Sequence, residues 1–273
     1  MWTVIRKPSR DTLENWARAW PVEREVDNNL ALGIARRGGG VTYAAGVAPR
    51  SEAQAHSVVA LTEVEFSLGP LPVDAAAPLV DDLLAAGVES MPGVHGPTEL
   101  SRRLAELWCE RRGTTATRGM HNRFYALDRL LRPSPTPSGS ARQATEDDVD
   151  TVAEWLVGFA EDADLPSFDT VAKARSLIGE GDVSLWLDPE PVSMSALSGR
   201  TARTARVGYV FTPRDARGRG YGAAATTASV EHARRTGVER CCLFADVENP
   251  LTNRLYQRLG FTARFETTEF VFA

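Results

Sequence analysis

The feature that most constrains this chain is an apolar strand that runs through a loop into three closely spaced glycines and a helix. The strand covers residues 205–212, Gly218, Gly220 and Gly222 follow, and a helical pattern begins near Tyr221. Glycine lets the backbone turn tightly and approach a ligand closely. The first amides of a helix have no partner within it, and the helix dipole adds positive charge there. The segment therefore predicts a binding site for a phosphate or pyrophosphate.

The charge around this loop favours the same ligand. From Arg200 to Arg240 there are nine arginines and three acidic residues, in a chain whose net charge is -5. Such a concentration attracts a multiply charged anion. The alternative is a solvated basic helix face, which needs no ligand.

Residues 218–223 also satisfy the dinucleotide pattern G-x-G-x-x-G/A, and Asp246 lies about where a ribose-binding acid would follow. Two observations oppose a dinucleotide fold. The loop of residues 212–217 separates the strand from the glycines, although the dinucleotide turn follows its strand directly. Only one further strand–helix unit remains, so a doubly wound sheet cannot be completed.

A second motif lies nearer the C-terminus, in residues 244–261. It consists of a strand, Asn249-Pro250, a helix with Asn253 and Tyr256, and then Gly260-Phe261. Together with the segment Arg-Gly-Arg-Gly-Tyr-Gly at 217–222, which resembles the R/Q-x-x-G-x-G/A loop, it resembles the GNAT acetyltransferase superfamily. The resemblance covers residues 141–273. It implies an α/β fold with a mixed sheet (the GNAT acyl-CoA N-acyltransferase fold) and acetyl-CoA as co-substrate, with no metal.

The length of 273 residues allows two domains, and a proline-rich seam marks the boundary. We predict an N-terminal domain over 1–132, a linker over 133–140 and a catalytic GNAT domain over 141–273. Residues 65–88 and 207–238 share the order strand, loop, helix and Gly-Val, which suggests a duplication. Because the first copy lacks the glycine loop, the N-terminal domain is interpreted as a degenerate GNAT-like copy. Shared α/β patterning without duplication is the alternative.

Apolar spacing and turn residues predict the remaining elements. Helices are expected at 11–20, 26–36, 73–86, 98–112, 168–178, 221–235 and 250–259, and after a Thr145 cap. Strands are expected at 41–47, 56–68, 123–127, 142–145, 183–187, 192–198, 205–212 and 240–245, with two short strands at the end. Residues 91–97 are expected to be a loop, and Trp16, Trp20 and Trp108 are expected in the core.

The resemblance also implies roles for individual residues. Val210, Phe211 and Thr212 would pair their backbone with the pantetheine arm, and an amide near Val210 would stabilise the oxyanion. Tyr256 would lie near the thioester sulfur and protonate the departing thiolate as general acid. The expected contacts of the coenzyme are the amides of Gly218, Arg219, Gly220, Tyr221 and Gly222, the side chains of Arg217 and Arg219, and Asn249 and Asn253. Arg217 and Arg219 could instead face solvent, Asn249 could be a turn residue, and Asn253 could cap and pack.

The general base is left open. Many GNAT enzymes use a glutamate on the fourth strand, but that strand has no carboxylate here. The candidates are Asp246, Glu161, Asp162 and Asp164, or a chain of waters. Cys241 and Cys242 are interpreted as core residues, which disfavours a covalent route, and His56, His95 and His121 receive no chemical role.

The function predicted from these motifs is direct transfer of an acetyl group from acetyl-CoA to a primary amine of a small molecule. A protein or peptide N-acetyltransferase and a non-catalytic acyl-CoA-binding sensor are the alternatives. The negative net charge disfavours nucleic-acid binding. Three cysteines form no disulfide or zinc pattern, and no signal or membrane segment is evident. We therefore expect a cytoplasmic protein that does not bind a membrane, and a homodimer remains open.

Overall fold

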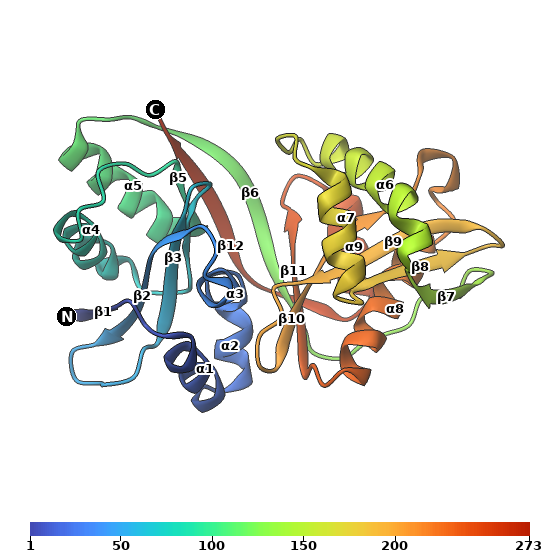
Figure 1. Cartoon of the computed structure of the whole chain (residues 1–273), viewed down its shortest axis with the longest axis horizontal. Coiled ribbons are helices and arrows are strands. Elements are labelled where there is room, and N and C mark those ends of the chain that lie inside the picture. The colour runs from blue at the N-terminus through green and yellow to red at the C-terminus, as the bar shows by residue number, and fades with distance from the viewer.

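The computed structural model describes residues 1–273 as one mixed twelve-stranded sheet with helices packed against it (Figure 1). The strands of the N-terminal half are β1 (Trp2–Arg6), β2 (Val41–Pro49), β3 (Ser57–Thr62), β4 (Phe66–Leu68), β5 (Gly93–Pro97) and β6 (Ala116–Leu127). Its helices are α1 (Arg10–Ala19), α2 (Val22–Asp27), α3 (Asn29–Arg37), α4 (Ala76–Ala85) and α5 (Thr98–Arg112).

The C-terminal half repeats this alternation. Its strands are β7 (Ser140–Gln143), β8 (Val183–Leu187), β9 (Pro191–Ser198), β10 (Thr204–Phe211), β11 (Arg240–Asp246) and β12 (Phe261–Phe272). Its helices are α6 (Val149–Asp162), α7 (Thr170–Gly179), α8 (Tyr221–Arg235) and α9 (Pro250–Arg258). The mixed α/β fold predicted from the sequence is confirmed, and both stretches of the suspected repeat fold as strand, loop and helix.

The two halves exchange their last strands. The order across the sheet is β1-β2-β3-β4-β5-β12-β6-β11-β10-β9-β8-β7. β6 of the N-terminal half thus lies between β11 and β12, and β12 of the C-terminal half pairs with β5. Figure 1 shows these two long strands passing between the halves. The sheet is therefore continuous across the proline-rich seam, and each half is completed by a strand of the other.

A second junction lies where α2 and α3 contact the β9–β10 turn. Glu25 of α2 is fully buried and pairs with Arg203 at 2.8 Å, and it also accepts a hydrogen bond of 2.6 Å from Thr201. Asn29 of α3 is fully buried too and donates to the Gly199 carbonyl at 2.8 Å. Because removing one partner would leave a buried charge or amide unsatisfied, these contacts fix the orientation of the halves.

Most elements fall where the sequence predicted them. α5 and α8 have the expected bounds. Thr145 forms a capping box with Asp148 at the 3₁₀ turn of residues 146–148, which leads into α6. Trp16, Trp20 and Trp108 are buried in the N-terminal half, as expected. None of the helices has the length and apolar character that crossing a bilayer requires.

Four expectations were wrong. Residues 91–97 were expected to be a loop, but Gly93–Pro97 forms β5, an interior strand of the sheet. A side chain at Gly93 would lie 2.7 Å from the Phe270 carbonyl oxygen, so glycine there lets β12 approach closely.

The helix expected at 26–36 is two helices that meet at Asn28, and the strand expected at 56–68 is β3 and β4. The two short terminal strands are one strand, β12, because β6 pairs with it from Phe261 to Phe272 and β5 pairs with it from Thr267 to Val271.

Candidate functional site

The glycine loop before α8 presents free backbone amides. Gly218 and Gly220 have φ of 79° and 85°, a left-handed conformation that other residues rarely adopt. Gly220 is the N-cap of α8, and none of the amides of residues 218–223 donates a hydrogen bond within the protein. The loop around Gly218 and Gly220 is exposed. A row of unpaired amides at a helix start is the arrangement that binds phosphate.

The strands beside this loop separate. β10 and β11 pair only from Thr204 with Arg240 to Arg206 with Cys242. Beyond this point the pairing of β10 with β9 shifts register between Gly208 and Phe211, and Tyr209 has φ of 50°. The bulge turns β10 away from β11, so its edge near Val210 is free to pair with an extended ligand.

The start of α8, the end of β10 and α9 meet at one place. A Cβ at Gly222 would lie 3.4 Å from Thr212 Oγ1 and 3.9 Å from both Val210 Cγ1 and Leu255 Cδ1. A glycine at 222 therefore leaves room where the three elements converge. The structure thus brings together the loop, the strand end and the helix that carries Tyr256.

Tyr256 lies on α9 with its ring packed edge-on against Phe261, at 5.9 Å between ring centroids. The residue is 8% exposed, and its hydroxyl forms no hydrogen bond within the protein but is not sealed from solvent. Burial raises the pKa of Tyr256 to about 12. The phenol therefore stays protonated at neutral pH and keeps a proton to donate.

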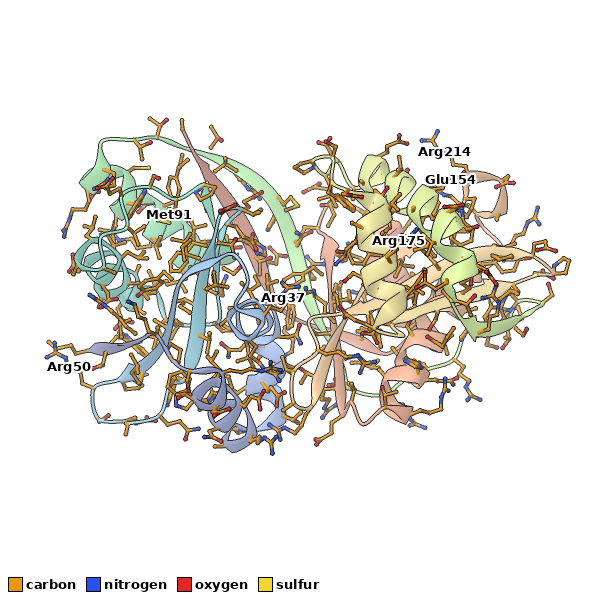
Figure 2. The ribbon with its side chains drawn as sticks, viewed as in Figure 1. Arg37, Arg50, Met91, Glu154, Arg175 and Arg214 are labelled. Carbon is orange, nitrogen blue, oxygen red and sulfur yellow. The ribbon has the colours of Figure 1, made fainter.

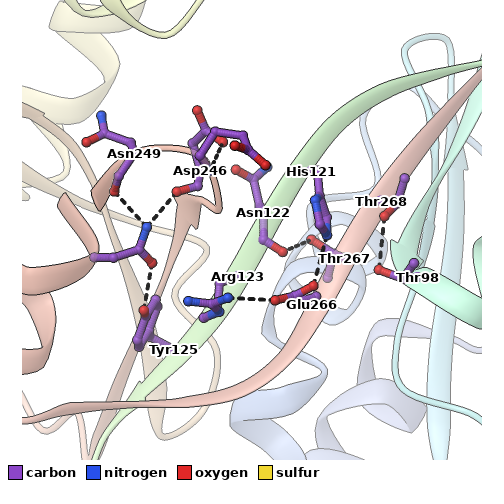
Figure 3. A network of polar contacts seen from close by, with 12 residues as sticks. Thr98, His121, Asn122, Arg123, Tyr125, Asp246, Asn249, Glu266, Thr267 and Thr268 are labelled. Carbon is purple, nitrogen blue, oxygen red and sulfur yellow. Dashed lines mark hydrogen bonds and ion pairs between the residues drawn. The ribbon is translucent and has the colours of Figure 1, made fainter. Parts of the chain in front are cut away.

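Asn253 holds α9 against the rest of the sheet. Its Nδ2 donates to the carbonyls of Asp246 and Asn249 at 2.7 Å each, and its Oδ1 accepts a hydrogen bond of 2.6 Å from Tyr125 (Figure 3). Both ends of this buried amide are thus used inside the protein. The coenzyme contact expected for Asn253 stays a prediction, and the capping and packing role is the one observed.

Asn249 caps α9. Its Oδ1 accepts hydrogen bonds of 3.2 Å from the amides of Leu251 and Thr252, and Pro250 occupies the first turn. Its Nδ2 forms no hydrogen bond within the protein, and the residue is exposed. Asn249 is therefore a turn residue that keeps a free donor beside the end of β11.

The two arginines of the loop differ. Arg217 pairs with Asp162 of α6, donates to the Thr212 carbonyl at 2.9 Å and lies over the Phe211 ring. It therefore ties the loop to β10 and α6. Arg219 is exposed and forms no ion pair within the protein. Tyr221 donates its hydroxyl to Asp188 and so anchors the start of α8 to the β8–β9 turn.

Comparison with known families decides the assignment. Residues 117–262, just over half of the chain, match the sequence model of the family described as "Acetyltransferase (GNAT) domain". The chain belongs to this family. The GNAT match begins inside β6, so it includes the strand that the N-terminal half contributes.

Solved structures share the fold across nearly the whole chain. A GCN5-related N-acetyltransferase from Sphaerobacter thermophilus has 19% identity and a TM-score of 0.59, covering 98% of this chain and 94% of its own. A Drosophila protein has 14% identity and a TM-score of 0.67, with 99% of both chains covered. A tandem GNAT protein from the clavulanic acid biosynthesis pathway has 12% identity and a TM-score of 0.54, covering 100% and 98%. Comparison with curated proteins finds no match.

Among the candidates for a general base in this GNAT site, the structure engages two. Asp162 is paired with Arg217, and Asp246 Oδ1 accepts a hydrogen bond of 2.9 Å from the Glu248 amide. Glu161 and Asp164 are exposed and form no ion pair. Cys241 and Cys242 are buried, and burial raises the pKa of the Cys241 thiol to about 12 and also raises that of Cys242. Their interpretation as core residues is confirmed.

Sequence reasoning missed the polar groups that the N-terminal half and β12 bring to the end of β11. Asn122 of β6 pairs with Asp246, and the His121 carbonyl accepts from the Val247 amide at 3.1 Å. His121 also lies 3.0 Å from Glu266, which pairs with Arg123 at 2.7 Å (Figure 3). No local pattern marks these residues, because their proximity depends on the strand exchange.

Proposed function

We propose that this protein is an N-acetyltransferase that moves the acetyl group of acetyl-CoA directly to a primary amine of a small molecule. The observation that carries the proposal is the row of unpaired amides at residues 218–223 beside the separation of β10 from β11. A diphosphate needs several donors at one place, and an extended arm needs a free strand edge. The C-terminal half offers both within one loop and strand.

The coenzyme would be held by three groups of atoms. The amides of residues 218–222 and the free Arg219 side chain would bind the pyrophosphate. The backbone of Val210, Phe211 and Thr212 would pair with the pantetheine arm, and Asn249 Nδ2 would donate to the same arm. Arg217, which is engaged with Asp162, would support the loop rather than bind phosphate.

The reaction follows from these positions. A neutral amine attacks the thioester carbonyl, and a backbone amide of the β10 bulge near Val210 stabilises the developing oxyanion. The C–N bond forms, the C–S bond breaks, and Tyr256 donates its proton to the departing thiolate. The proton that the nitrogen loses passes to solvent, and Tyr256 recovers its proton from solvent. With a pKa near 12, Tyr256 enters each cycle protonated.

Two measurements test this function separately. Isothermal titration with acetyl-CoA should give a dissociation constant below about 1 mM, within the ordinary range for enzyme substrates. A panel of small amines assayed by release of free thiol should then identify acceptors. Absence of binding at millimolar acetyl-CoA would refute the assignment, and binding without turnover of any amine would favour the sensor function.

A further inference from the structure

A partly buried arginine on β10 lacks an anionic partner. Arg206 donates one hydrogen bond, from Nη1 to Asn29 Oδ1 at 3.1 Å, and no carboxylate lies within ion-pair distance. Asn29 is itself fixed, because its Nδ2 donates to the Gly199 carbonyl and to Thr204 Oγ1 at 2.9 Å. The guanidinium is therefore held in place by a neutral neighbour, and its remaining donors have no protein acceptor.

A partly buried carboxylate of the N-terminal half shows the converse arrangement. Glu65, whose side chain is 19% exposed, accepts a hydrogen bond of 2.6 Å from the fully buried Ser67. The buried His95 is 3.9 Å away, and no arginine or lysine pairs with Glu65. Its carboxylate is thus also fixed by its neighbours and left without a strong cationic partner.

Glu65 and Arg206 hold corresponding positions in the N-terminal and C-terminal halves. β4 pairs with β5 and β5 with β12, as β10 pairs with β11 and β11 with β6. Along these registers Glu65, directly before Phe66 of β4, corresponds in the N-terminal half to Arg206 of β10 in the C-terminal half. The region between them contains the ring of His95, which is 5.7 Å from the ring of Phe244. Phe244 stands two residues beyond the last β10–β11 pair, so a group held against it lies beside the gap between these strands.

The charges influence one another without pairing. Burial lowers the pKa of Arg206 and the nearby Arg37 lowers it further, whereas Glu65 is among the groups that raise it. Arg37 lies between the halves at the end of α3 (Figure 2). Charges withdrawn from water are costly unless something compensates them. Here each is hydrogen-bonded to an uncharged residue, Arg206 to Asn29 and Glu65 to Ser67.

We propose that the acceptor is an amine that carries a carboxylate, an amino acid or a close relative, held over Phe244 between the two halves. Arg206 pairs with its carboxylate, and Glu65 receives its amino group. This proposal rests on the proposed acetyltransferase function and specifies the substrate class. It also explains why the degenerate half is retained, because Glu65, His95 and Asn29 all belong to it.

The first test needs no substitution. Amino acids are compared with their amides and with the amines that lack the carboxyl group, in an assay of thiol release at fixed acetyl-CoA. Because a charge-assisted pair to Arg206 forms only with the acid, kcat/KM should favour it by about 10- to 100-fold. Equal rates for the acid and its amide would overturn the inference, although turnover itself would still support the acetyltransferase function.

The second test uses Arg206→Gln, with Arg206→Lys as the conservative variant. Arg206→Gln should raise KM for the carboxylated acceptor and erase the preference over its amide, and Arg206→Lys should restore part of it. Arg175→Gln, an exposed arginine on α7 that forms no ion pair, is the matched control and should keep the preference (Figure 2). Acetyl-CoA binding by calorimetry reports whether each variant is folded. Retention of the full preference in folded Arg206→Gln would contradict the proposal.

Discussion

The two halves have the same order of strands and helices, except that three helices follow β1 and two follow β7, yet only the C-terminal half has glycines that expose a row of free amides, residues 218–223, before its helix. In the C-terminal half, glycines at 218 and 220 turn the chain and expose amides before α8. In the N-terminal half, the corresponding loop contains Pro70 and Pro72, which have no N–H to donate.

The strand pairs next to these loops also differ, because one pair separates and the other stays closed. β10 and β11 separate, but the end of β4 stays close to β5, since a Cβ at Gly96 would lie 2.6 Å from the Cβ of Leu68. The space that would admit an extended ligand is therefore filled by backbone and side chains. The comparison shows that two copies of one fold differ at this point through a bulge and a few glycines, which leave free amides and a free strand edge in the C-terminal half alone.

The largest expected effect concerns Tyr256, the proposed proton donor of the C-terminal half. Tyr256→Phe keeps the ring in its packing against Phe261 but removes the hydroxyl. We expect kcat to fall about 100-fold, with acetyl-CoA affinity unchanged within about twofold, as for loss of a general acid. Steady-state kinetics and calorimetry check this, and an unchanged kcat would remove Tyr256 from the mechanism.

The next effect compares the addition of a methyl group at two glycines, Gly220 before α8 and Gly87 after α4. Gly220 and Gly87 have φ of 85° and 80°, so alanine should destabilise the fold by about 1 kcal/mol at either position. Only Gly220→Ala should also weaken acetyl-CoA binding, by about 10-fold, because only this residue precedes the free amides. Titration calorimetry and urea unfolding distinguish the two outcomes. Equal affinities would show that the loop does not bind the coenzyme.

A smaller effect tests whether the exchanged strand supports α9. Tyr125→Phe removes the hydroxyl that donates to Asn253 and leaves a buried amide oxygen unsatisfied. The free energy of unfolding should fall by about 1–2 kcal/mol. If α9 is also displaced, KM for acetyl-CoA should rise, although Tyr125 does not contact the loop. Unchanged stability and KM would mean that the exchanged strand does not position the helix.

The smallest effect is a loss of stability at the start of the first helix of each half. The loss is expected to depend on pH at Asp148, before α6, but not at Ser9, before α1. The Arg142 guanidinium lowers the pKa of Asp148 to about 2, against an ordinary value of 3.8. A depressed pKa stabilises the fold above pH 3.8, and this contribution is lost as the pH falls through 2. Asp148→Asn should therefore cost about 1 kcal/mol near neutral pH and almost nothing at pH 2.

Ser9 caps α1 in the N-terminal half by accepting a hydrogen bond of 3.1 Å from the Thr12 amide. Because no carboxylate takes part in this hydrogen bond, Ser9→Ala should cost about 1 kcal/mol at every pH. Thermal unfolding across the pH range measures both losses. If the Asp148→Asn loss persisted at pH 2, the pair with Arg142 would not be its cause.

Local signals in the sequence predicted much of this molecule. The glycines at 218 and 220, the Asn-Pro before α9 and the bounds of α5 and α8 follow from residue types that act within a few positions. β5 was missed because Gly93 and Gly96 suggest a loop, and only contact with β12 and β4 makes them suitable for a strand. Asn253 could be located on its helix, but its partner Tyr125 could not.

The sequence by itself determined where the chain turns and which helix start is rich in free amides, and it placed Tyr256, the proposed proton donor, on the helix after Asn249-Pro250. Only the tertiary structure decided that β6 and β12 change places, that Tyr125 holds α9 and that His95, beside Glu65, lies against Phe244 of β11. The physical reason is the separation along the chain of the residues that interact. Turns and caps are set by neighbours along the chain, whereas strand order depends on which distant edges pair, and side-chain alternation does not specify that choice.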